Sequence, residues 1–89
     1  MKTATISVTT AQNIRITRAL DLLHMEDAIL HMSLAEDSVV VVTLGAHCLR
    51  AVADVVHEDD PELAKVLRRL DTKLKKQAAV DWLRNKFGF

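Results

Sequence analysis

The chain has 89 residues, with 12 basic and 12 acidic side chains and a formal net charge of zero. Hydrophobic residues make up 49% of it and aromatic residues 3%, which excludes a disordered polar chain and predicts one small domain with an aliphatic core. The single cysteine excludes an intrachain disulfide, and no apolar run approaches the roughly 20 residues of a membrane span, so we expect a cytoplasmic protein without a membrane segment.

The zero net charge hides a division along the chain. Residues 1–60 carry four basic and nine acidic side chains, a net charge of −5, whereas residues 61–89 carry eight basic and three acidic ones, a net charge of +5. Such asymmetry steers association with surfaces of opposite charge. It indicates binding to another protein or to a second copy of the chain, and it specifies no chemistry.

Residues 1–9 form an extended N-terminal segment with the pattern of a strand. Ala4, Ile6 and Val8 alternate with threonine and serine, the period of two that is typical of a half-buried strand. Thr9 and Gln12 then match a capping box. We therefore expect a helix to begin near Thr10.

A first helix is predicted over residues 10–32. Residues 22–25 (Leu-Leu-His-Met) return as residues 29–32 (Ile-Leu-His-Met). The two copies are seven residues apart, which is close to two helical turns. The helix would carry two apolar stripes, one for the protein's own core and one, with Met25, Ile29 and Met32, as a candidate oligomer interface. A central helix that contacts both of its neighbours is the alternative.

A second helix is predicted over residues 34–58. Polar residues from Thr43 to His57 recur at spacings of four and three, with apolar residues between them. The four consecutive valines of residues 39–42 instead favour a buried strand by propensity. A strand–helix–strand–helix–helix layout therefore remains as the second interpretation.

A third helix is predicted over residues 61–86, with Asp60 as its N-cap and Pro61 in its first position. Leucines at residues 63, 67, 70 and 74 give it one narrow apolar stripe. The expected fold is therefore mainly all-α, a three-helix bundle-like single domain, with an extended segment at residues 1–9 and a helical domain at residues 10–89.

The third helix also holds the candidate partner-binding residues. Its basic residues lie opposite the leucine stripe, and every aromatic residue of the chain falls within residues 82–89, at the end of this helix and just beyond it. Aromatic side chains are frequent interface anchors, although they could instead close the core, and a basic face is often only a solvated one. The candidates are Lys65, Arg68, Arg69, Lys73, Lys76, Trp82, Phe87 and Phe89.

No residue pattern in the chain predicts catalysis, a cofactor or a metal site. His24, Asp27 and His31 would share a helical face, but a closed zinc site needs a fourth ligand. Cys48 would face the apolar seam of the second helix as a small buried hydrophobic residue. There is no glycine-rich phosphate loop and no nucleophile motif, so an enzyme is not expected.

The expected function is therefore that of a small, self-associating, non-enzymatic interaction module of the adaptor or inhibitor kind. A DNA-binding regulator is the alternative, using the basic face or an N-terminal β-ribbon. The alternating segment resembles the strand that ribbon-helix-helix repressors insert into the major groove, with Thr3, Thr5, Ser7 and Thr9 facing the bases. The chain departs from that pattern because it lacks a glycine turn after a short first helix.

Overall fold

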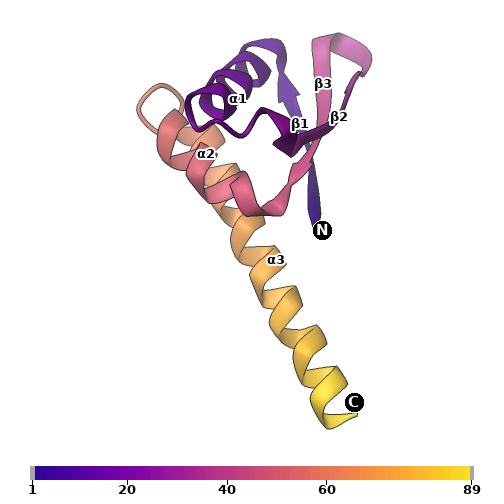
Figure 1. Ribbon diagram of the computed structural model, residues 1–89. Coiled ribbons are helices and arrows are strands. Elements are labelled where there is room, and N and C mark those ends of the chain that lie inside the picture. Colours follow the sequence, from indigo (N-terminus) through magenta and orange to yellow (C-terminus); the bar gives the residue numbers. More distant parts are fainter. Residues whose placement is uncertain (1, 89) are drawn as a thin grey trace.

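The computed structural model describes residues 2–88 and is a two-layer α/β structure in which helices cover one face of a three-stranded antiparallel sheet (Figure 1). The sheet order is β1-β3-β2, so the last strand in the sequence lies in the middle. The elements are β1 (Thr3–Thr9), α1 (Thr10–Leu22), β2 (Ile29–Leu34), β3 (Val39–Gly45), α2 (Leu49–Val56) and α3 (Pro61–Phe87), with 3-10 turns η1 (Glu26–Ala28), η2 (Glu36–Ser38) and η3 (Ala46–Cys48).

The predicted three-helix bundle is wrong, and the first reason is that the helix expected over residues 10–32 ends at Leu22. The backbone N–H of Leu23 closes the last turn, and His24 then adopts a left-handed conformation with φ 55°. Residues 29–32, the second copy of the repeat, lie in β2 instead. Only the start of this helix agrees with the prediction, because the Thr9–Gln12 capping box is present.

The second reason is that the four valines form a strand, so the helix expected over residues 34–58 is also wrong. β3 pairs with β1 along its whole length, with Ile6 opposite Val42, and with β2 on its other side. β-branched side chains suit the centre of a sheet, and pairing on both sides outweighs the helical periodicity. Between residues 34 and 58 the structure has one α-helix, α2. The second interpretation, with a strand at residues 39–42, is therefore the correct one for these residues.

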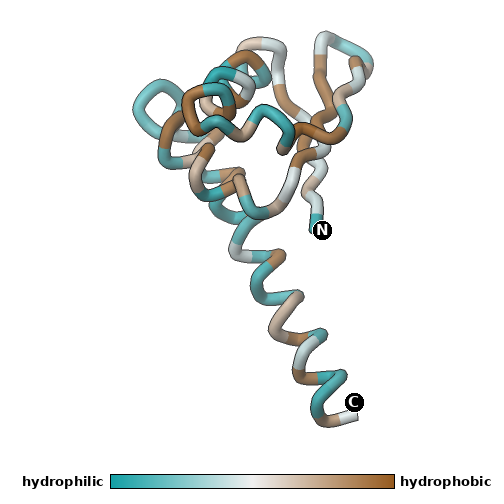
Figure 2. Tube along the Cα trace, viewed as in Figure 1, coloured by the Kyte–Doolittle hydropathy of each residue, from teal (hydrophilic) through white to brown (hydrophobic). Residues whose placement is uncertain are grey.

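The core lies between the sheet and the three helices. β1, β3 and the three α-helices each contribute the apolar residues of one face, whereas β2 contributes only the partly buried Ile29. Figure 2 shows the hydrophobic residues concentrated in the upper part of the molecule. The largest fully buried side chains are Ile16, Leu20, Val42, Leu44, Cys48, Leu49, Val52, Leu63 and Leu67. All of them except Val42, Leu44 and Cys48 come from helices.

Asp60 joins the start of α3 to α1. Its Oδ1 accepts a hydrogen bond from the backbone N–H of Leu63 at 3.1 Å, which confirms the predicted N-cap. Its Oδ2 lies 3.2 Å from a guanidinium nitrogen of Arg15 and 3.4 Å from the amide nitrogen of Gln12. The Asp60 side chain is only 16% exposed, so a largely buried carboxylate ties the start of α3 to α1.

α3 extends well beyond the rest of the molecule. Its first turns pack against α2 through the buried residues Leu63, Ala64 and Leu67, and Leu70 and Leu74 lie partly buried against the same core. From residue 79 onward every described residue of α3 is exposed, and the molecule reaches 45 Å along its longest axis (Figure 1). We call residues 79–87 the distal segment and the remaining structure the body. Within residues 2–88, no helix is both long and apolar enough to cross a membrane.

Candidate interaction surface on α3

One side of α3 carries the residues that are best placed to contact a partner. They follow each other at alternating spacings of four and three residues, which keeps them on one side of a helix. The first three are basic and the last three are apolar. This outer face of α3 consists of Arg69, Lys73, Lys76, Val80, Leu83 and Phe87.

The three basic residues of the outer face have no ion-pair partner within residues 2–88. Other basic residues of α3 are engaged: Arg68 lies 2.9 Å from Asp54 of α2 and 3.5 Å from His57. Lys75 lies 3.0 Å from Asp71, and Lys65 lies 4.0 Å from Glu62. Of the predicted basic site residues, Arg69, Lys73 and Lys76 therefore remain available to a partner, whereas Lys65 and Arg68 have acidic neighbours in the chain itself.

A shallow hollow of about 510 Å³ runs along the basic part of the outer face. Its wall ends at Val80, the first of the three apolar residues. The long side chains of the surrounding cations therefore enclose a surface that becomes apolar toward the C-terminal end. The residues around it are Arg68, Arg69, Thr72, Lys73, Lys76, Gln77 and Val80.

The distal segment exposes large apolar side chains to solvent. Val80 is 42% exposed, Leu83 40% and Phe87 62%. Trp82 is 58% exposed and lies outside the outer face, with the Lys86 ammonium 5.6 Å from the centroid of its ring. Neither described aromatic closes the core, and Phe89 lies outside the described residues. The sequence prediction omitted Val80 and Leu83 from the site. Their spacing of four and seven residues from Lys76 places them on the same side of the helix, and this spacing could have identified them.

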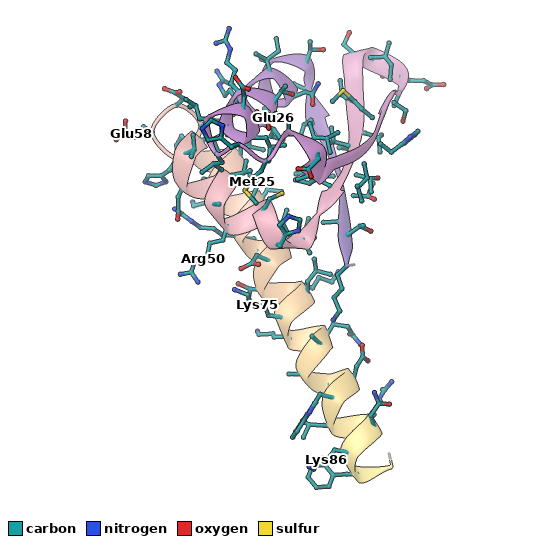
Figure 3. The ribbon with its side chains drawn as sticks, viewed as in Figure 1. Met25, Glu26, Arg50, Glu58, Lys75 and Lys86 are labelled. Atoms are coloured by element: carbon teal, nitrogen blue, oxygen red, sulfur yellow. The ribbon has the colours of Figure 1, made fainter. Side chains whose placement is uncertain are left out.

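The charges of the body and of α3 are separated in space as well as in sequence. The acidic turn Glu36–Ser38 and the turn between α2 and α3 lie at the end of the body opposite the end from which α3 extends (Figure 1). Figure 3 shows Glu58 at the turn between α2 and α3 and Lys86 near the far end of α3. The basic helix therefore points away from the acidic turns of its own chain.

A second group of charged residues lies between α2 and α3. Arg50, Asp54, Arg68, Asp71 and Thr72 line a hollow of about 360 Å³. Both carboxylates in this group already take part in ion pairs, with Arg68 and Lys75. Of these two ion pairs, only Arg68–Asp54 joins the two helices, since Lys75 and Asp71 both lie on α3.

The residues of the predicted oligomer interface do not form a stripe, because the helix that would align them is absent. Met25 and Ile29 are half-buried and pack against the core. Met32 lies on β2, where its Sδ accepts a hydrogen bond from the Asn13 amide at 3.4 Å. The structure therefore separates these three side chains between the core and the edge of the sheet.

The candidate metal ligands lie in different elements, and the cysteine is buried. His24 lies in the turn after α1, Asp27 in η1 and His31 in β2, and no group of three or more potential metal ligands occurs within residues 2–88. Cys48 is buried, and its thiol donates a hydrogen bond to the carbonyl oxygen of Gly45 at 3.0 Å. Burial raises the pKa of this thiol, which favours its neutral, unreactive form.

Comparison of the chain with protein-family models, with curated proteins and with solved structures gave no match.

Proposed function

We propose that the protein is a non-enzymatic protein–protein interaction module that presents the outer face of α3 to an acidic partner protein. The observation that carries this proposal is the distal segment, which leaves the body while exposing three large apolar side chains on one side of a helix. A helix that projects in this way gains no stability from its own core. It is well suited to lie in a groove of another molecule.

The apolar residues would supply most of the binding energy. Val80, Leu83 and Phe87 have the i, i+3 and i+7 spacing of helices that bind in apolar grooves. Full burial of a side chain of this size contributes about 1.5–3 kcal/mol. An exposed ion pair contributes about 0–1 kcal/mol, so each apolar side chain should contribute more than each basic one.

The basic residues would select the partner by charge. Arg69, Lys73 and Lys76 continue the outer face toward the body, so a complementary groove is apolar at one end and acidic at the other. A second α3 does not meet this requirement, since parallel pairing sets cation against cation and antiparallel pairing sets cations against apolar residues. The arrangement therefore favours a different, acidic protein, as expected for an adaptor or an inhibitor.

Capture from a lysate of the source cells, with the purified protein immobilised, tests this proposal when variants are compared. We expect Leu83→Asp to lose at least ten-fold of the captured partner, because a charge replaces a buried anchor. Asn85→Asp adds the same charge on the other side of the helix and should retain the partner. Lys73→Glu combined with Lys76→Glu should also lose it, and the captured protein should have an acidic surface.

Two results would contradict the proposal. One is capture that Leu83→Asp leaves unchanged, because the apolar residues would then not be anchors. The other is retardation of duplex DNA at low salt that Lys73→Glu combined with Lys76→Glu abolishes, because this result would assign the basic residues to phosphate contacts. Circular dichroism of each variant checks that α3 remains helical.

A further inference from the structure

The outer edge of β1 is an unused pairing surface. Within residues 2–88, β1 pairs only with β3, and it does so without a break from Thr3 opposite Gly45 to Thr9 opposite Val39. β1 is therefore an edge strand whose second row of backbone N–H and C=O groups faces away from the sheet. In the related β-α-β-β-α-β motif a final strand completes the sheet, but here α3 follows α2 in its place.

The sequence of β1 is symmetric about Ile6. An antiparallel pair of two β1 strands centred on this residue would set Ala4 opposite Val8 and Thr5 opposite Ser7 of the second copy, with Thr3 opposite Thr9. All apolar residues would then lie on the side that the helices cover, and all hydroxyl residues on the other side. This register therefore preserves the period of two across the junction, as a continuous sheet requires.

β1 also lacks the features with which proteins protect exposed edges. Residues 3–9 contain no charge and no proline, and their pairing with β3 has no bulge. The other edge strand, β2, has an irregularity between Ile29 and His31. Antiparallel pairing of two β2 strands would in addition bring Glu36 and Asp37 of one copy near Glu26 and Asp27 of the other. Like charges therefore disfavour the β2 edge, and nothing comparable disfavours β1.

We propose that two copies of the chain pair through the outer edges of β1, antiparallel about Ile6, so that two three-stranded sheets become one continuous six-stranded sheet. The pairing uses the same edge in both copies, so it closes as a twofold dimer. It would leave the outer face of α3 uncovered and present that face twice. A partner with two binding sites would then bind more tightly than a single copy allows.

Replacement of the central hydroxyl residues tests the dimer without disturbing the core. Thr5 and Ser7 lie on the uncovered side of β1, where they neighbour Thr43 and Val41 of β3. Thr5→Lys combined with Ser7→Lys would place four ammonium groups together in the dimer, and the corresponding Glu variant would place four carboxylates. Ser33→Lys, on the uncovered side of β2, is the matched control.

Sedimentation equilibrium provides the measurement. We expect twice the 9.9 kDa chain mass for the unchanged protein and for Ser33→Lys, and the single chain mass for the Lys and Glu double variants. An equal mixture of the two double variants should return to the dimer mass, because opposite charges then meet across the junction. This recovery also shows that both variants are folded.

Three results would overturn the dimer: an unchanged protein that stays monomeric at high concentration, a dimer that survives the Lys double variant, or open-ended assembly, which indicates pairing of β1 with β2. The test is separate from that of the α3 proposal. Leu83→Asp should remain dimeric, and the Lys double variant should still capture the partner, more weakly.

Discussion

Replacement of Leu67 by alanine is expected to lower the free energy of unfolding by about 2–5 kcal/mol, the cost of removing a large side chain from a packed core. Leu67 is fully buried and anchors α3 against the body. The domain is small, so a loss of this size is a large share of a total stability of about 5–15 kcal/mol. Urea unfolding monitored by circular dichroism measures the change.

The matched control is the same substitution in the distal segment of the same helix. Leu83→Ala removes a side chain that is 40% exposed and lies beyond the part of α3 that touches the core. We expect a change within about 0.5 kcal/mol, as for other surface substitutions. Similar losses for Leu67→Ala and Leu83→Ala would mean that the distal segment is packed, and would contradict the division of α3 into a docked and a projecting part.

Replacement of Asp60 by alanine is expected to lower the free energy of unfolding by about 2 kcal/mol. Loss of an N-cap acceptor alone costs about 0.5–2 kcal/mol, and here the Arg15 guanidinium and the Gln12 amide lose their partner as well. Both are tied to a carboxylate that is only 16% exposed, so water replaces these contacts incompletely.

Asp60→Asn separates the two contributions. Asparagine is as good an N-cap as aspartate, so this variant should retain the bond from the Leu63 N–H, while an NH2 group replaces the oxygen that Arg15 and Gln12 contact and both of those contacts are lost. We expect about half of the loss seen with alanine or less, measured by the same urea unfolding. If Asp60→Asn and Asp60→Ala lower the free energy of unfolding equally, the N-cap contributes nothing and the contacts of the Asp60 Oδ2 atom account for the whole stabilisation.

The sequence predicts those features of the fold that depend on neighbouring residues. The Thr9–Gln12 capping box and the Asp60–Pro61 start of α3 are local arrangements, and both are present. The sheet is different, because β3 acquires its partners from segments on both sides of α1. Val39 to Val42 signal a strand by propensity, and β2 precedes them by one short turn, but β1 lies on the far side of α1 in the sequence. The helical spacing of the residues that follow favours a helix, and no local pattern reveals the sheet partners that decide against it.

The candidate surface on α3 can likewise be predicted only in part from the sequence. The position of the basic residues opposite the leucine stripe follows from helical spacing alone, and α3 spans Pro61–Phe87 against the predicted 61–86. The engagement of Arg68 by Asp54 depends on how α2 packs against α3, which no local pattern specifies. The exposure of the aromatic residues depends on where the body ends, and this again is a property of the assembled core.

Amide hydrogen exchange along α3 in the absence of a partner tests most directly whether its distal segment is presented for binding. We expect slow exchange for residues 63–74, which pack against the body, and exchange at least a hundred-fold faster for residues 79–87, which are exposed and lie outside the core. Addition of the captured partner should slow exchange in the distal segment. Equal protection along the whole of α3 in the protein alone would contradict the account, because the apolar side of the distal segment would then already be covered.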